Sequence, residues 1–146
     1  MDIYEVLTED HREVQKMLNR LSGTSENAVK TRQEVFGQLK ELLIAHSKAE
    51  AKVFYPAVDD DQDHGLIDEA RHAHDEVEQL LNEMSKMDCG SREWSDKFRT
   101  LKKSVEEHVR DEERQIFKEA HRMLDEDDAD SIGDEMEEEE ERLLKH

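Results

Sequence analysis

The stretch "LLIAHSKAEAKVFYP", residues 42–56, determines how the rest of the chain is interpreted. It has the composition of a helix interior and ends in a proline, which cannot continue a helix. Within it, His46 and Glu50 stand four residues apart on the face where apolar side chains are expected. A second segment, "VEEHVRDEE", repeats the spacing at His108 and Glu112. Because residues four apart stack on one helix face, the repeat predicts two ionisable pairs directed into a helical core.

The composition outside these segments favours a fold built only of helices. The chain has 146 residues, a length that suits one domain with one core. It contains one proline and five glycines, and 42% of its residues are charged. The hydrophobic fraction of 34% leaves only a narrow core. Narrow cores are typical of helix bundles, which need only two or three apolar positions per heptad.

Apolar periodicity predicts four helices, over residues 3–21, 28–55, 66–87 and 92–124, with Ser91 as the N-cap of the last. We assign residues 1–124 to a four-helix bundle. Residues 125–146 form an acidic segment that is either a disordered tail or a short fifth helix. Ile132 and Met136 fall near helical spacing there, and the leading aspartates suit a helix N-terminus, so we favour the helix.

Each of the four predicted helices carries one histidine on its apolar stripe: His11, His46, His74 and His108. A single histidine on such a stripe is more often a hydrogen-bonded core residue than a metal ligand. Four of the eight histidines in the chain, one on each helix, are harder to explain in that way. The other four lie off the stripes: His64 in a loop, His146 at the end of the chain, and His72 and His121 on other helix faces.

Glu50 and Glu112 extend the apolar stripes by one turn. A carboxylate buried in a bundle core costs several kcal/mol unless it is paired or bound to a metal, and no lysine or arginine lies on these stripes. Four imidazoles and two carboxylates are too many for one tetrahedral ion with an open position, but they suit two ions bridged by the carboxylates. Mixed imidazole and carboxylate ligands favour iron or manganese, and zinc is an alternative.

Other features of the chain exclude several classes of partner. The formal net charge of −19 argues against nucleic acid and against anionic membranes. The N-terminus lacks a signal-peptide pattern, and no apolar stretch approaches the ~18 residues of a membrane span. Cys89 is the one cysteine, so no internal disulfide forms, and a free thiol fits a reducing compartment. We therefore expect a cytoplasmic protein.

The order of these residues resembles the hemerythrin family in its bacterial HHE cation-binding form. The segments "LTEDHREV", "HSKAEAKVFYP" and "HVRDEERQIF" look like segments of that family. The resemblance implies an antiparallel, up-down four-helix bundle around a non-haem di-iron centre. By position in the sequence, it also assigns residues of this chain to two roles, as terminal and as bridging ligands. The terminal ligands would be His11, His46, His74 and His108, and the bridging ligands Glu50 and Glu112.

One departure from the oxygen-carrying hemerythrins stands out. Those proteins have a further histidine four residues before the third-helix ligand, where this chain has Ala70. The departure argues against reversible oxygen carriage and leaves one metal more open to water, to peroxide or to a protein oxygen. Tyr55, beyond Glu50, and Tyr4, on the first helix, are the candidate replacements, although core packing explains a tyrosine more often.

The resemblance implies a protein that binds or senses O2, NO or a related small oxidant at two iron ions. Two alternatives stay open. One is a di-iron redox enzyme that decomposes peroxide, as a catalase does, or that handles NO. The other is a role in iron storage or repair. A ferritin-like bundle is rejected, because it needs two Glu-x-x-His motifs and only Glu69 and His72 have that spacing, off the apolar stripe.

Overall fold

The computed structural model describes residues 1–60 and 65–145, and these residues form helices joined by short loops, with no β-strand. The prediction of an all-helical fold is therefore confirmed over this part of the chain. His64 and His146 lie outside the described residues. The elements in chain order are α1 (Ile3–Ser22), α2 (Val29–Ala49), η1 (Glu50–Phe54), α3 (Tyr55–Val58), α4 (Gly65–Ser85), α5 (Arg92–Asp111), η2 (Glu112–Ile116), α6 (Phe117–Met123) and α7 (Glu126–Leu144).

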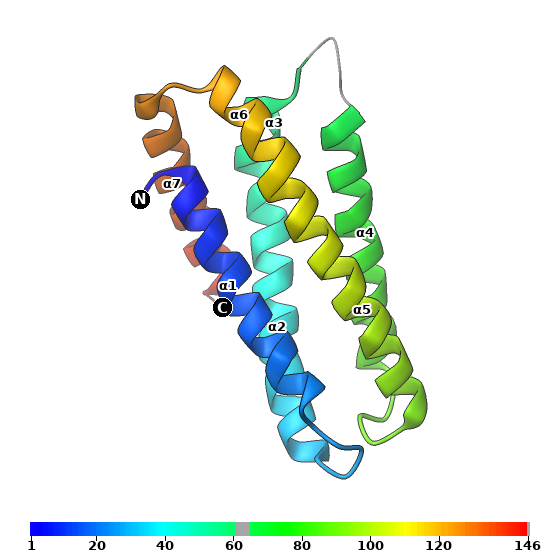
Figure 1. Ribbon diagram of the computed structural model, residues 1–146. Helices are drawn as coiled ribbons and strands as arrows, with labels where there is room; N and C mark the ends of the chain where they lie inside the picture. Colours follow the sequence, from blue (N-terminus) through cyan, green and yellow to red (C-terminus); the bar gives the residue numbers. More distant parts are fainter. Residues whose placement is uncertain (61–64, 146) are drawn as a thin grey trace.

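The elements form four long rods and one further helix. The first rod is α1, the second is α2 with η1 and α3, the third is α4, and the fourth is α5 with η2 and α6. Figure 1 shows the chain reversing its direction from each rod to the next. α1 contacts α2 and α5, and α4 contacts α5 and α2, so the four rods surround one central axis. None of the described helices is both long enough and apolar enough to cross a membrane.

The helix ends follow local rules, with one departure from the sequence prediction. Asp2 caps α1 through a capping box with Glu5, and the Ser91 side chain accepts a hydrogen bond from the Trp94 backbone N–H at the start of α5, as predicted. The second rod does not end at Pro56. It continues to Val58, because Pro56 falls in the first turn of α3, where a missing N–H is tolerated.

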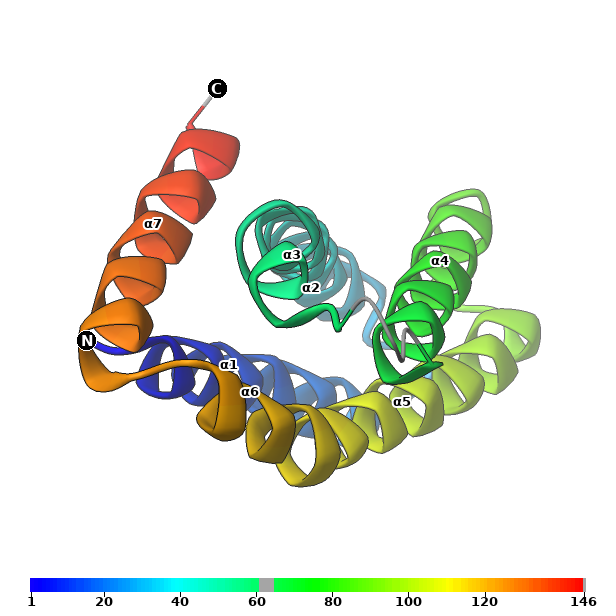
Figure 2. The ribbon, with the colours of Figure 1, turned by 90° about the horizontal axis from the view of Figure 1, so that it is seen from above.

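The acidic C-terminal segment forms a helix, but the prediction that it is short was wrong. α7 has 19 residues and begins with a capping box between Asp125 and Asp128. It lies along α1 and α2, on the side of the bundle opposite to α4 (Figure 2). Met136 is fully buried in this contact, and Gly133 is so close to the backbone of Met1 that any side chain would collide with it. α7 therefore has a packed, apolar face despite its many carboxylates.

Two apolar clusters fill the bundle at different levels. The distal cluster lies toward the α1–α2 and α4–α5 loops and includes Leu18, Leu39, Leu81, Trp94 and Leu101. The proximal cluster lies toward the chain termini and includes Ile3, Phe54, Ile67, Ile116 and Met136. The four stripe histidines fall between the two clusters on their helices, so the predicted site occupies a polar layer inside an otherwise apolar core.

Candidate metal centre

The structure brings all six predicted ligand side chains together in this polar layer. Glu50 and Glu112 are fully buried, His11 and His46 are buried, and His74 and His108 are nearly so. They come from the four different rods: His11 from α1, His46 and Glu50 from α2 and η1, His74 from α4, and His108 and Glu112 from α5 and η2.

The six side chains form two overlapping groups. The first group contains His11, His46, Glu50 and Glu112, and the second contains His74 and His108 with the same two glutamates. In each group one nitrogen or oxygen atom per residue lies within 4.8 Å of those of the others. The shared Glu50 and Glu112 stand where carboxylates would stand if they bridged two cations.

Several polar atoms of these six side chains form no hydrogen bond in the fold. His11 Nε2, His46 Nε2, Glu50 Oε2 and Glu112 Oε1 are buried and form no hydrogen bond, although His11 Nε2 lies 3.2 Å from Glu112 Oε1. Leaving a buried polar group unsatisfied costs about 1–3 kcal/mol, and more for a charged group. All four atoms belong to side chains of the cluster. The donor set therefore fits a bound metal, because cations would satisfy these atoms and compensate the buried charge.

A π-helical turn begins at each of the two glutamates. The Tyr55 N–H donates to the Glu50 carbonyl, and the Phe117 N–H donates to the Glu112 carbonyl, so both turns have the i to i+5 hydrogen bond. The wider turn changes which side chains face inward. Val53, three residues after Glu50, is only partly buried, whereas Phe54 and Tyr55 are fully buried. Regular steps of three and four residues fail here because the turn holds an extra residue.

As a result of the first π turn, the phenol of Tyr55 lies in the middle of the cluster. Its oxygen is 2.9 Å from Glu50 Oε1, 2.7 Å from Glu112 Oε2 and 3.1 Å from His74 Nε2. A phenol has one proton and can donate it to only one of these atoms at a time. Burial, and then the two nearby carboxylates, raise the pKa of Tyr55 well above its usual range, so in the metal-free chain the phenol keeps its proton.

Tyr4, the other candidate replacement ligand, is not brought to the site. Its ring stacks on His121, with 3.9 Å between ring centroids, and meets the edge of Phe117 at 5.3 Å. Its buried hydroxyl forms no hydrogen bond with the described residues. Tyr4 is therefore a packing residue of the proximal end, and its predicted role as a ligand does not fit its position.

Carboxylates outside the cluster hold two of the histidine rings. His11 Nδ1 lies 2.7 Å from Glu113 Oε2, and His46 Nδ1 lies 2.8 Å from Asp10 Oδ2. With Nδ1 bonded outward, Nε2 of each ring is directed at the cluster, as metal-ligating histidines require. Sequence reasoning missed both carboxylates, although each lies directly beside a predicted ligand in the chain.

α7 adds a third carboxylate behind His46. Glu140 is buried, and it forms a group with Asp10 and His46 in which the polar atoms lie within 4.8 Å of one another. Burial, followed by the hydrogen bond with Asp10, raises the pKa of Glu140 to about 9. Burial alone would also raise the pKa of Asp10, but hydrogen bonds with His46 and Glu140 lower it. At neutral pH the pair therefore shares one proton, held on Glu140. No pattern in the acidic segment marks this residue.

The electrostatics of the metal-free cluster are uneven. Burial and the charge of Glu112 raise the pKa of Glu50 well above its usual range. Burial acts on Glu112 in the same direction, but the adjacent side chains of Glu50, His108 and His11 hold its pKa well below the usual range. Without a metal, Glu50 is therefore the more readily protonated of the two glutamates.

The histidines also differ from one another. Burial lowers the pKa of His11, but the adjacent carboxylates of Glu112 and Glu113 outweigh it and raise the pKa to about 9. Burial and the neighbouring His108 lower the pKa of His74 to about 3. Near pH 7 His74 is therefore neutral and ready to bind a cation, whereas His11 must first lose a proton.

Comparisons with known proteins agree with this description. A family model described as "Hemerythrin HHE cation binding domain" matches residues 2–120. A protein of Nostoc sp. named "DNA nickase" is 32% identical over 117 residues, which are 80% of this chain but only 33% of the relative. This chain therefore spans about a third of that protein's length.

A solved structure gives the fold comparison. A hemerythrin HHE cation-binding domain-containing protein from Mycobacterium kansasii superposes with a TM-score of 0.87 and a sequence identity of 23%. The match covers 99% of this chain and 88% of the other. At that identity the likeness shows a shared fold. Because it covers nearly the whole chain, it includes the region of α7.

Proposed function

Because the chain belongs to the hemerythrin HHE cation-binding domain family, we propose that it holds two iron ions that bind a small oxidant such as O2, NO or peroxide. One observation carries the proposal. The six clustered side chains divide into two four-residue groups that share Glu50 and Glu112. A single cation would leave two imidazoles without a role, whereas two cations use every member of the set.

In the proposed centre, His11 and His46 with the two glutamates would hold one cation, and His74 and His108 with the same Glu50 and Glu112 would hold the other. Imidazole and carboxylate ligands favour iron or manganese, and zinc is less suited. Bound iron would supply electrons to the oxidant or a coordination position for NO. The apolar clusters on both sides of the layer exclude bulk water and restrict the site to small molecules.

Tyr55 supports a role beyond passive packing. Its oxygen is within 3.1 Å of Glu50, Glu112 and His74, so it is next to the half of the site where Ala70 replaces the further histidine of the oxygen carriers. We propose that Tyr55 either donates its proton to a bridging carboxylate or gives its oxygen to the nearby cation.

This position favours one alternative, the decomposition of peroxide. A phenol held among the bridging carboxylates can give or accept the proton that cleavage of a peroxide O–O bond requires. The same geometry gives no specific support to iron storage or repair. Binding of a small oxidant remains the primary proposal, and turnover of peroxide is the second.

The activity named for the Nostoc relative is not proposed for this chain. The shared part is about a third of that protein, and the net charge of −19 disfavours contact with the phosphates of DNA. The free thiol of Cys89 supports our proposal of a cytoplasmic, reducing environment.

Metal analysis of protein purified without oxygen tests the primary proposal. We expect about two iron ions per chain after loading with Fe(II), from the two residue groups. Fewer than one ion of any metal per chain would refute the proposed centre. Addition of hydrogen peroxide then separates the two functions: oxygen release at a rate above that of the metal-free protein supports turnover.

Tyr55→Phe refines this test. If Tyr55 handles protons in peroxide cleavage, the variant keeps two irons per chain but releases oxygen more slowly. Tyr4→Phe is the matched control, since Tyr4 is remote from the cluster, and it should change neither quantity.

A further inference from the structure

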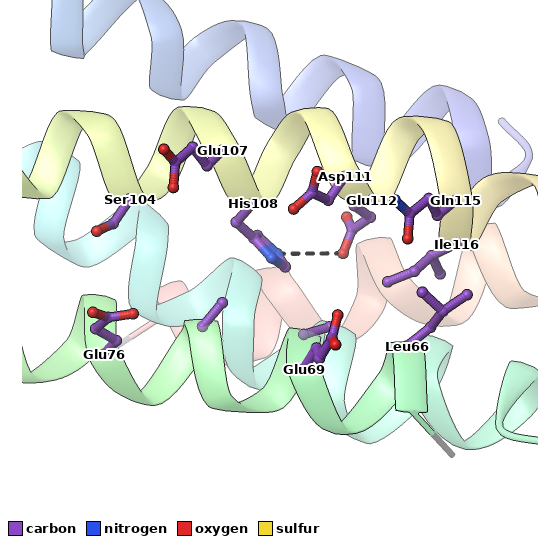
Figure 3. A pocket seen from close by; sticks show the side chains of 12 residues that line it. Leu66, Glu69, Glu76, Ser104, Glu107, His108, Asp111, Glu112, Gln115 and Ile116 are labelled. Atoms are coloured by element: carbon purple, nitrogen blue, oxygen red, sulfur yellow. Dashed lines mark ion pairs between the residues drawn. The ribbon is translucent and has the colours of Figure 1, made fainter. Parts of the chain in front are cut away.

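A cleft between α4 and α5 connects the candidate metal centre with the surface. It encloses about 190 Å³, and His108 and Glu112 lie at its inner end. Two small residues of α4, Ala70 and Ala73, line it where larger side chains would close it. Figure 3 shows His108 and Glu112 between the two helices, with side chains of both around them.

The outer part of the cleft is acidic. Glu69 and Glu76 lie on its α4 side, and Glu107 and Asp111 lie on its α5 side (Figure 3). All four are exposed, and no lysine or arginine lines the cleft. Among the described residues none of the four forms an ion pair. Their charges are therefore not neutralised locally and act together on ions in the cleft.

The inner end of the cleft reaches a buried carboxylate of the candidate centre. Glu112 is fully buried, and its Oε1, which forms no hydrogen bond, lies 3.2 Å from His11 Nε2. The acidic outer part therefore leads to a carboxylate that can bind a cation. Ser104 and Gln115 line the same cleft and add neutral oxygens along the way.

The other openings near the centre are less suited to a cation. A space of about 20 Å³ beside the four histidines is lined by Val14, Leu43, Val77 and Val105, and it has room for only about one water molecule. A larger groove of about 400 Å³ between α1 and α7 reaches Asp10 and Glu140, but none of the six clustered residues lines it. Of these three openings among the described residues, the α4–α5 cleft alone gives a hydrated divalent cation a polar path to the clustered atoms.

We propose that the cleft between α4 and α5 is the route by which divalent cations enter the centre, and that its rim carboxylates raise the rate of entry. The inference rests on the proposed two-metal centre. It adds a selectivity, because the rim charges attract cations and repel anions.

The test measures the uptake of Co²⁺ by the metal-free full chain in a stopped-flow instrument. The variant Glu69→Gln/Glu107→Gln removes two rim charges and leaves the clustered residues intact. We expect its bimolecular uptake rate to fall roughly three- to tenfold at low ionic strength, and the difference to vanish in about 0.5 M salt. The final number of bound ions per chain should not change.

The matched control is Glu137→Gln/Glu141→Gln, which removes the same charge from the groove between α1 and α7. It should leave the uptake rate within about twofold of the original protein. Equal slowing of both variants, or slowing of the control alone, would overturn the cleft as the route. Ala73→Leu provides a second measurement, because it narrows the cleft without changing charge and should slow uptake at every salt concentration.

The two proposals fail in different ways. If the original protein binds no Co²⁺ or Fe²⁺ at equilibrium, both proposals are wrong. If it fills with about two ions but neither the rim variant nor Ala73→Leu fills more slowly, the centre stands and the cleft proposal is refuted.

Discussion

The two halves of the candidate metal centre use the same kinds of ligand but differ in their surroundings. In the closed half, His11 and His46 are each held by an outer carboxylate, and α7 covers this side of the bundle. In the open half, His74 and His108 have no carboxylate on Nδ1 among the described residues, and the α4–α5 cleft reaches His108. The side chains of His11 and His46 are 5% exposed, against 11% for His74 and His108.

This difference suggests a division of roles between the halves. Carboxylates that fix the orientation of histidine ligands raise the affinity of a metal site. The closed half should therefore bind its cation more tightly. The open half has Tyr55, a small side chain at Ala70 and access to solvent. We therefore expect the oxidant to bind in this half.

The largest effect is expected from Glu112→Ala, because it removes a group common to both halves. Metal content should fall from about two ions per chain to fewer than one, and the stabilisation of the protein by added Fe²⁺ should disappear. Metal analysis and thermal unfolding with and without Fe²⁺ measure these changes. His72→Ala is the control: His72 is exposed on α4, two residues from His74, and its loss should affect neither result. If His72→Ala binds no metal, the assignment of the six inward-facing ligand residues is wrong.

A smaller loss, of one ion, should follow from removing a histidine of either half. His74→Ala should keep the tightly held ion of the closed half. His46→Ala should keep only the ion of the open half, which a chelator should extract more readily. The comparison is made by titrating each protein with a competing chelator. Equal retention by the two variants would contradict the division into a closed and an open half.

Replacing an outer carboxylate should weaken metal binding without abolishing it. Asp10→Asn should lower the affinity of the closed half by about 10–100-fold, because the His46 ring loses its anionic partner. Glu140→Gln should have a smaller effect, since glutamine is neutral, as Glu140 is at pH 7, and can still donate to Asp10. The dissociation constant, measured by competition, is the readout. An effect of Glu140→Gln as large as that of Asp10→Asn would show that Glu140 acts as an anion.

The smallest expected effect is the change in metal affinity caused by a shift of one pH unit. In the metal-free chain the pKa of His11 is raised to about 9, so at pH 7 the residue is protonated and must release its proton to bind a cation. Affinity should therefore rise between about pH 7 and 9, by at most about tenfold per unit, and fall as the pH is lowered. Calorimetry in buffers of different ionisation enthalpy counts the released protons. In His11→Ala this release should be smaller.

The sequence alone predicted the features of this structure that follow from helical periodicity. The spacing of His46 and Glu50, and of His108 and Glu112, is a property of a single helix, so it places both side chains on one face before any packing is known. Apolar periodicity located the four rods, and the helical spacing of Ile132 and Met136 located α7. The length of α7 was underestimated because its strongly acidic composition resembles that of a disordered tail.

Only the tertiary structure decided how the two halves of the site differ. The π turn after Glu50, which brings Tyr55 into the site, leaves no mark in the sequence, because the buried groups of neighbouring helices select it. The partners of the histidine rings come from distant parts of the chain: Glu113 is 102 residues from His11, and Asp10 is 36 residues from His46. Helix periodicity fixes the direction of a side chain relative to its own helix. Which side chain it meets depends on how the helices pack, and that packing made one half closed and the other open.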